Sequence, residues 1–438
     1  MSSEGPAFPV SVSDLHFPSA AVSVSQLLSS LRRSALSVTN RLRSVEADAR
    51  FVHEVADHYE LPLIANERCG SWYIDPAQKA ASAYFKSTDG HTGQWNFSLR
   101  RLNLQILSLA RDHGGCIIVD STRRGKLMPD ALSKTIPIWC AVLNRTLFPT
   151  EPALHPVQFP PNFLTASEEA QIEKRIDGFV KALQELKLDL KQLTQDLGQP
   201  IQIAWANQSY FYPTALQKGE KYNLFVLCSA SRRVHGAEAS EGAPVFWENK
   251  DLLLATEESE LPDVIKELMH SHGKADTGRQ AALLRPSSNL YITQAFGASG
   301  EYGDYDLVIS CNDKPPESGS SANRLDLGCG PHKIGSRDLR SALGKVIDFV
   351  EKHFNTDASQ SLLVACETGK DLSVGTLLAI ICRFYDDNGK FVDKQPQNHI
   401  DKQFIRQRLA WIITSKPDAN PSRATLQSVN AFLLQRPD

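Results

Sequence analysis

The sequence has 438 residues, enough for two or three domains, and its apolar (42%) and charged (22%) fractions are those of an ordinary globular protein. The formal net charge of −3 excludes a generally basic surface, so any nucleic-acid contact must be a local patch. No apolar run reaches the length of a membrane span, and the N-terminus lacks the basic and apolar regions of a signal peptide.

The eight cysteines predict free thiols rather than disulfides or a zinc site. They are scattered along the chain, without a C-x-x-C pair and without histidines at zinc-ligand spacing. Unpaired cysteines in a long chain are typical of a reducing compartment. We therefore expect no zinc and a cytoplasmic location, with the nucleus as the alternative.

Residues 19–313 are predicted to form an N-terminal mixed α/β region, behind a Ser- and Pro-rich flexible arm at residues 1–18. Hydrophobic periodicity and charge patterns predict helices at residues 20–59, 97–111, 130–147 and 168–197. Short apolar runs predict strands at residues 116–120, 201–205, 222–228 and 306–310. Five prolines within residues 149–161 predict a linker, and the polar and aromatic mixture at 61–73 is typical of a functional loop.

The most informative stretch is residues 116–126, where a buried strand runs into a charged loop. The strand ends at Asp120, and the loop consists of Ser121, Thr122, Arg123, Arg124, Gly125 and Lys126. Pro129 then suits the first turn of a helix. Backbone N–H groups at a helix start, together with three cations, favour phosphate binding. Asp120 is a candidate ligand for magnesium or for a ribose hydroxyl, with capping of the loop as the structural alternative.

A second polar cluster lies earlier in the chain, at residues 86–95. Lys86 and Ser87 are candidate phosphate ligands. His91 is a candidate general base for a hydroxyl or a candidate phosphate donor, and an exposed histidine is the alternative. Arg100 and Arg101 follow the cluster closely and are candidates for phosphate contacts, with a solvated helix face as the alternative.

Residues 324–438 predict a separate C-terminal α/β domain, because residues 314–323 are rich in Ser, Pro and Gly. Its predicted strands are residues 325–328 and 361–366, and its predicted helices are residues 337–354, 374–385, 402–415 and 422–434.

The loop after the strand at 361–366 resembles the phosphate loop of dual-specificity cysteine phosphatases, whose pattern is Cys, five residues, Arg and then Ser or Thr. Its matching residues are Cys366, Gly369 and Ser373, and Thr368 and Lys370 lie between them. Leu372 stands at the arginine position, which removes the bidentate clamp on a phosphoryl group. A backbone nest at the helix start remains, and it suits phosphate binding better than nucleophilic catalysis by Cys366.

Several segments together resemble the family of initiator-tRNA 2'-O-ribosylphosphate transferases. The resemblance is carried by residues 69–73, 86–91, 119–126, 129–140 and 327–330. The phosphatase-like loop agrees with it, because that family ends in a phosphatase-like domain. The resemblance spans nearly the whole chain, and the 119–140 block is its most specific part.

The resemblance implies an enzyme that modifies cytosolic initiator tRNA. It would transfer 5-phosphoribose from phosphoribosyl pyrophosphate to the 2'-hydroxyl of the T-stem adenosine at tRNA position 64. The added phosphate would exclude the tRNA from elongation and confine it to initiation. The leaving pyrophosphate must be neutralised, for which the resemblance implies magnesium.

The resemblance also implies roles for the candidate residues. Asp120 and His91 become the catalytic candidates, and the two phosphate loops become candidates for holding the 5'-phosphate and the pyrophosphate, in either order. Arginines in several segments become candidates for the tRNA backbone, because A-form RNA is held largely through phosphates and 2'-hydroxyls. These tRNA candidates are Arg100, Arg101, Arg232, Arg233, Arg337 and Arg340.

Three other functions are compatible with parts of the pattern. The first is a phosphatase acting through Cys366, which the missing arginine disfavours. The second is a catalytically degenerate phosphatase-like protein that binds RNA or a phospho-ligand. The third is an ordinary phosphoribosyltransferase, which would place paired acids where this sequence has only Asp120.

Overall fold

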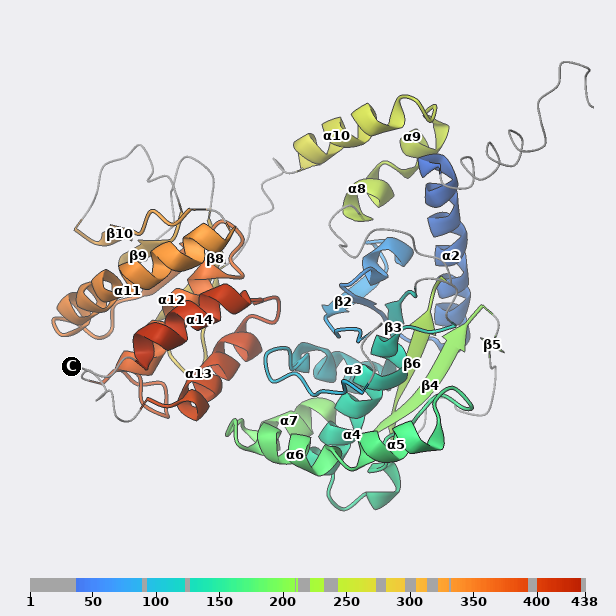
Figure 1. Cartoon of the computed structure of the whole chain (residues 1–438), viewed down its shortest axis with the longest axis horizontal. Coiled ribbons are helices and arrows are strands. Elements are labelled where there is room, and N and C mark those ends of the chain that lie inside the picture. Colours follow the sequence, from blue (N-terminus) through green and yellow to red (C-terminus); the bar gives the residue numbers. More distant parts are fainter. Residues whose placement is uncertain are drawn as a thin grey trace, which may run out of the picture.

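The computed structural model describes residues 37–88, 93–122, 127–208, 210–211, 221–231, 243–272, 281–295, 305–312, 322–330, 332–392 and 400–434. These residues form two α/β units, each built around its own sheet (Figure 1). The mixed α/β class predicted from the sequence is confirmed. Within the described ranges, no helix is both long enough and apolar enough to span a membrane.

The first unit contains a six-stranded sheet in the order β2-β1-β3-β6-β4-β5. Its strands are β1 (Leu63–Asn66), β2 (Lys79–Ala83), β3 (Gly115–Asp120), β4 (Ile201–Asn207), β5 (Tyr210–Phe211) and β6 (Asn223–Ser229). The first five strands in this order run parallel, and β5 pairs antiparallel with β4. All six residues of β3 are buried at the centre of the sheet, as the apolar run at 116–120 predicts.

Helices cover both faces of this sheet, which explains why its strands are apolar on both sides (Figure 1). One face packs against α3 (Leu107–His113), α4 (Ile136–Leu147), α5 (Ala166–Glu173), α6 (Ile176–Gln184) and α7 (Leu190–Leu197). The other face packs against α2 (Val38–Tyr59), α8 (Ala243–Glu248), α9 (Lys250–Ala255) and α10 (Leu261–His272).

The structure corrects three predicted elements of this unit. The functional loop predicted at 61–73 contains the buried strand β1, which pairs with β2 and β3. The helix predicted at 97–111 begins only near Leu107, because Asn103 adopts a left-handed conformation and bonds the backbone of Tyr84. The helix predicted at 168–197 is three helices, and Lys187, at a positive φ of 53°, lies between the last two.

The proline-rich segment at 149–161 is fastened to the first unit rather than being a free linker. The side chain of Asn144 on α4 donates to the Leu154 carbonyl at 2.9 Å, and Arg145 donates to the His155 carbonyl at 3.0 Å. The Val157 side chain is buried in the core beneath α4. The segment at 149–161 is therefore held against the first unit by hydrogen bonds from α4.

The second unit contains a five-stranded sheet in the order β10-β9-β11-β8-β7. Its strands are β7 (Ala282–Leu283), β8 (Leu290–Gln294), β9 (Leu307–Ser310), β10 (Arg324–Asp326) and β11 (Leu362–Cys366). Its helices α11 (His332–Phe354), α12 (Leu372–Phe384), α13 (Lys402–Ser415) and α14 (Arg423–Leu433) contribute to a single core on one face.

The sheet of the second unit begins earlier in the chain than the sequence predicts. The central strand β11 lies between β8 and β9, both of which precede the predicted boundary at 314–323. That boundary therefore falls inside the second unit. Parallel pairing across long sequence separations leaves no local signal, which is why composition alone misplaces the boundary.

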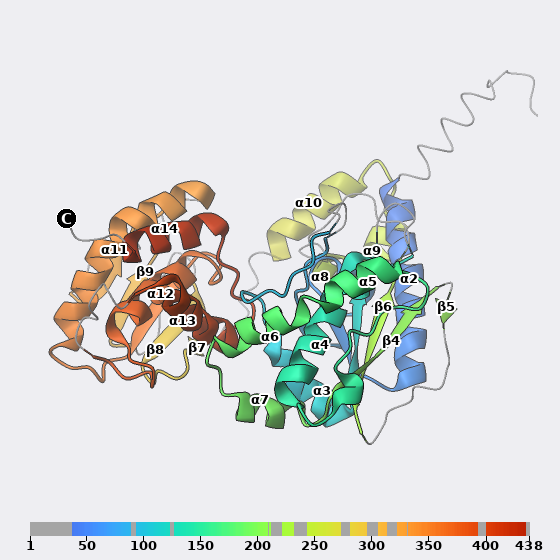
Figure 2. The ribbon, with the colours of Figure 1, turned by 60° about the horizontal axis from the view of Figure 1, so that its bottom comes forward.

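The two units meet along α13 and along the segment that follows it (Figure 2). The side chains of Gln403 and Gln407 both donate to the Glu185 carbonyl at 2.9 Å, at the end of α6. Ala410 of α13 is fully buried within the core of the first unit. Arg101 of the first unit also donates to the Asn420 side chain of the second.

Candidate functional site

Four polar residues end four neighbouring parallel strands of the first sheet. We call Asn66, Asp120, Ser229 and Asn207 the polar row; they end β1, β3, β6 and β4. Ser229 is the register partner of both Asp120 and Asn207, and Asn66 hydrogen-bonds Asp120 at 2.8 Å. Strand alternation places all four side chains on the sheet face that α4 covers. The carboxyl edge of a parallel sheet is where α/β proteins bind ligands.

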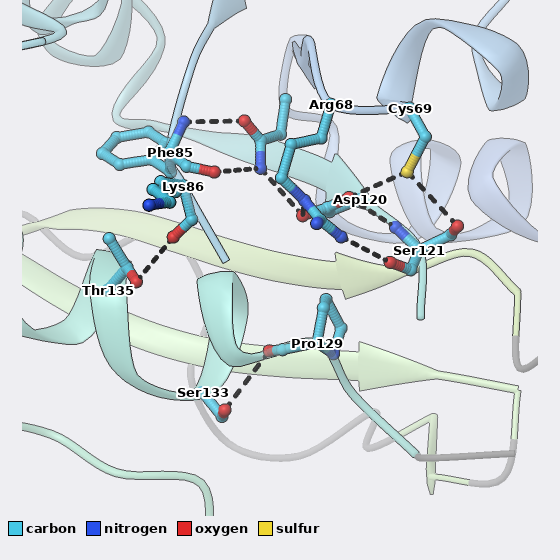
Figure 3. A network of polar contacts seen from close by, with 10 residues as sticks. Arg68, Cys69, Phe85, Lys86, Asp120, Ser121, Pro129, Ser133 and Thr135 are labelled. Carbon is cyan, nitrogen blue, oxygen red and sulfur yellow. Dashed lines mark hydrogen bonds and ion pairs between the residues drawn. The ribbon is translucent and has the colours of Figure 1, made fainter. Parts of the chain in front are cut away.

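Asp120 is completely buried, and both of its carboxylate oxygens accept hydrogen bonds from the protein (Figure 3). The Oδ1 atom accepts from the Ser121 backbone N–H at 2.8 Å and from the Cys69 thiol at 3.0 Å. The Oδ2 atom accepts from the Asn66 amide at 2.8 Å and from Arg68 Nε at 3.2 Å. Four donors therefore converge on a single carboxylate.

This arrangement does not fit the magnesium role considered for Asp120. A carboxylate offers about four lone-pair sites, and the four donors occupy that capacity. Burial raises the pKa of Asp120, while the Arg68 guanidinium and the hydrogen bonds from Cys69, Ser121 and Asn66 oppose that rise. With its acceptor capacity taken by protein donors, Asp120 has none left for a substrate group. Its role in this structure is to hold neighbouring groups.

Arg68 is a further candidate site residue, one that the sequence pattern does not single out. It lies in the turn after β1, and its Nη2 donates to the Ser121 carbonyl at 3.3 Å, in addition to the bond to Asp120. Its side chain is 12% exposed, whereas Asp120 is fully enclosed. Recognition of strand β1 would have pointed to Arg68, because polar residues that directly follow a parallel strand are candidate site residues.

The structure brings the predicted phosphate segment at 86–88 against the start of the helix that follows β3 (Figure 3). Thr88 donates to the Asp130 carboxylate at 3.1 Å, and Thr135 donates to the Lys86 carbonyl at 2.9 Å. The exposed Lys86 and the partly exposed Ser87 therefore lie near the carboxyl edge of the sheet. The helix opens with a π turn at Ala131–Thr135 before α4.

Several predicted site residues lie outside the described part of the chain. These residues are His91, Arg123, Arg124, Gly125, Lys126, Arg232 and Arg233. Two described residues next to these segments, Thr122 and Ser231, lie side by side, because the Thr122 N–H donates to the Ser231 carbonyl at 3.2 Å. Ser121 and Thr122 are themselves buried at the end of β3.

Arg101 connects the two units, whereas Arg100 is exposed. The Arg101 guanidinium carbon lies 3.5 Å from the centroid of the Tyr84 ring, and the guanidinium also donates to Asn420. Burial lowers the pKa of Arg101. Arg100 stays a predicted tRNA-phosphate contact, and the Arg101 guanidinium is held between the two units.

We expect Arg101→Ala to lower the free energy of unfolding by about 1–2 kcal/mol, because a cation–π contact and a hydrogen bond are both lost. Arg100→Ala is the matched control and should leave stability close to wild type. Urea unfolding of the full chain measures both variants. Equal stability of the two would contradict the connecting role of Arg101.

The phosphatase-like loop of the second unit packs closely around the Cys366 sulfur and against β8. Cys366 ends β11, and its sulfur lies 3.1 Å from the Ser373 hydroxyl and 3.8 Å from the Thr368 hydroxyl. Gly369 has a φ of +64°, and a Cβ there would lie 2.7 Å from the backbone nitrogen of Gln294. The loop leads into α12 at Leu372, which occupies the position of the phosphatase arginine.

This loop is connected to the first unit through the segment between α13 and α14. The Asn420 N–H donates to the Lys370 carbonyl at 2.9 Å, and the Ser422 N–H donates to the Asp371 carboxylate at 2.8 Å. Asn420 is also the residue that Arg101 contacts. The remaining tRNA candidates, Arg337 and Arg340, are exposed on α11.

Comparisons with known proteins agree with this two-unit organisation. Residues 31–270 match the family model described as the Rit1 N-terminal domain, and residues 323–433 match the Rit1 DUSP-like domain. A Saccharomyces cerevisiae protein named tRNA A64-2'-O-ribosylphosphate transferase is 33% identical, covering 94% of this chain and 95% of that protein. An uncharacterized protein of Schizosaccharomyces pombe is 34% identical, covering 90% of this chain and 94% of that protein.

Solved structures of phosphatases match a smaller part of the chain. The Yvh1 phosphatase domain from Chaetomium thermophilum is 18% identical, covering 35% of this chain and 95% of its own, with a TM-score of 0.28. The Cydia pomonella PTP-2 phosphatase is 14% identical, covering 35% of this chain and 89% of its own, with a TM-score of 0.25. Because these scores are low, the phosphatase-like character of the second unit rests on the family match.

Proposed function

This chain belongs to the Rit1 family, and we propose on that basis that it transfers 5-phosphoribose to the 2'-hydroxyl of adenosine 64 in initiator tRNA. The observation that carries the proposal is the match of both units, over 94% of the chain, to a protein named as a tRNA A64-2'-O-ribosylphosphate transferase. The chain is thus a pentosyltransferase, and the donor we propose is phosphoribosyl pyrophosphate.

The proposed reaction makes one bond and breaks one bond at C1 of the donor ribose. The 2'-oxygen of the tRNA attacks C1, the bond from C1 to the pyrophosphate oxygen breaks, and the 2'-hydroxyl proton leaves to a base. Negative charge accumulates on the departing pyrophosphate, so cationic and N–H donors near it accelerate the reaction. The carboxyl edge of the first sheet supplies such donors in Arg68 and Lys86.

Magnesium, which the family resemblance implies for the donor, is not assigned to the polar row. Asp120 is the only acid of that row, and its oxygens are occupied by four protein donors. Asn66 and Asp120 instead hold the turn at Arg68 and the loop start at Ser121 in place.

The second unit is proposed to bind phosphate or RNA rather than to hydrolyse phosphate. Its loop has a thiol and a backbone nest, but Leu372 stands where hydrolysis needs an arginine. The exposed Lys370 in this loop is available for attraction to a phosphate, although it also lies 3.6 Å from Asp418.

We expect Cys366→Ser to retain most of the transfer activity. The hydroxyl keeps a hydrogen bond to Ser373 and preserves the packing of the loop, since the thiol is not used as a nucleophile. Initial rates of transfer at saturating tRNA measure the effect. Loss of transfer as complete as that of an Asp120→Ala variant would restore a covalent role for Cys366.

The proposed function is tested by incubating the full chain with ³²P-labelled phosphoribosyl pyrophosphate, magnesium and either initiator or elongator methionine tRNA. Label is expected on initiator tRNA. Absence of label, combined with tRNA binding, would instead support a catalytically degenerate phosphatase-like RNA-binding protein. Hydrolysis of p-nitrophenyl phosphate that is lost in Cys366→Ser would support a phosphatase.

A further inference from the structure

We propose that Arg68 contacts a phosphate-bearing group of the donor, that Asp120 positions Arg68, and that the hydroxyls of Thr122 and Ser229 complete this contact site. The proposal rests on the proposed function. It adds Arg68 and Ser229, which the sequence did not single out, gives Asp120 another role, and keeps the phosphate role predicted for Thr122. Arg68 is a binding residue in this account, and Asp120 is a positioning residue because it acts through Arg68.

The geometry of Arg68 is fixed by two acceptors on neighbouring residues of one strand end. Its Nε donates to Asp120 Oδ2 at 3.2 Å, and its Nη2 donates to the Ser121 carbonyl at 3.3 Å. These two bonds set the plane of the guanidinium, whose five N–H donors form a rigid fork suited to phosphate. The side chain retains 12% exposure at the carboxyl edge of the sheet, where α/β proteins bind ligands.

Two buried hydroxyls beside this pair have no hydrogen-bond partner within the described part of the chain. They are Thr122 Oγ1, in a residue with no exposed surface, and Ser229 Oγ, in a residue 2% exposed. Ser229 is the register partner of Asp120, so both side chains leave the same face of adjacent strands. Buried polar atoms are nearly always hydrogen-bonded, and two exceptions at one strand edge indicate a ligand that supplies the partners.

The charges of the proposed contact site, formed by Arg68, Asp120, Thr122 and Ser229, favour an anion over a metal ion. Asp120 is the only acid of the polar row, and its four donors leave it without capacity for a cation. Arg68 and the two hydroxyls are donors toward a phosphate oxygen, and charge-assisted bonds from a guanidinium are the strongest of these. A diphosphate or a phosphorylated sugar therefore matches the site better than a divalent cation.

The test measures donor affinity separately from folding. Titration calorimetry with phosphoribosyl pyrophosphate, and with inorganic pyrophosphate as the simpler probe, is applied to wild type, Arg68→Gln, Arg68→Lys and Ser229→Ala. We expect Arg68→Gln to weaken binding by about tenfold or more and Arg68→Lys to restore it only in part, because lysine lacks the fork. Ser229→Ala should weaken binding about threefold to tenfold.

Arg145→Gln is the matched control, since Arg145 is a partly buried arginine of α4 that lies away from the polar row. It pairs with Glu173 of α5 and Asp177 of α6. This variant should lower stability without changing donor affinity. For the positioning role, Asp120→Asn should raise KM for the donor and leave KM for tRNA unchanged, which a purely structural role would not do.

The outcomes separate this inference from the proposed function. Wild-type transfer together with unchanged donor affinity in Arg68→Gln would overturn the inference alone. Equal loss of affinity in Arg145→Gln would also overturn it, since the effect would then act through folding. Pyrophosphate binding that depends on Arg68, without any transfer to tRNA, would support the anion site and contradict the proposed function. Absence of both binding and transfer in wild type would overturn both.

Discussion

Replacing Asp120 with alanine is expected to abolish transfer and to lower the free energy of unfolding by about 3–5 kcal/mol. The substitution removes the acceptor of four hydrogen bonds at the end of the central strand β3. It leaves the Arg68 guanidinium, only 12% exposed, without its carboxylate. The loss therefore combines an uncompensated charge with several unsatisfied donors.

Urea unfolding and initial transfer rates measure these two effects in Asp120→Ala. Asp177→Ala is the control for removal of an acid that pairs with arginine, because the Asp177 side chain is 88% exposed and bonds Arg145. It should remain close to wild type in both measurements, as exposed ion pairs contribute little. An Asp120→Ala protein with wild-type stability would contradict the buried network described for this residue.

Gly70→Ala is expected to be strongly damaging, with a loss of about 3 kcal/mol in unfolding free energy. A Cβ at Gly70 would lie 2.3 Å from the Val119 carbonyl oxygen and 3.1 Å from the Ala65 Cα. Both neighbours are backbone atoms of the central strands, so neither can move without disturbing the sheet. The turn would shift and carry Arg68 and Cys69 away from Asp120, so transfer should also fall sharply.

The control for Gly70→Ala is Gly178→Ala on α6. No atom lies within 4 Å of a Cβ built at Gly178, and alanine is a better helix former than glycine. Gly178→Ala should therefore be neutral or slightly stabilising by thermal unfolding, with unchanged transfer. If Gly70→Ala were as stable as Gly178→Ala, the close approach of the turn to β3 would be refuted.

Much of the fold was predictable where strands are short, apolar and followed by polar loops. The runs ending at Asp120, Cys228 and Cys366 all proved to be parallel strands of the two sheets. The strands β1 and β8 were not predicted, since polar residues surround the first and no periodicity marks the second. Both pair through long-range parallel contacts, which local sequence patterns do not encode.

The sequence predicted where the candidate site lies, but not what Asp120 does in it. The sequence placed Asp120 at the centre, and the structure confirms its location at the end of β3. Its burial and its four donors could not be inferred, because Asn66, Arg68 and Cys69 come from a segment whose strand went unrecognised. A metal ligand and a positioning carboxylate have the same sequence pattern and differ only in what surrounds them.

The central claim, that the chain adds phosphoribose to one 2'-hydroxyl of initiator tRNA, is tested most directly by mapping the modified nucleotide. A 2'-O-substituent removes the hydroxyl that attacks the neighbouring phosphodiester in alkali, so the modified position is missing from an alkaline cleavage ladder. After incubation with phosphoribosyl pyrophosphate, we predict one such gap, at adenosine 64 of initiator tRNA, and none in elongator tRNA. An unbroken ladder in initiator tRNA, or a gap at another nucleotide, would contradict the account.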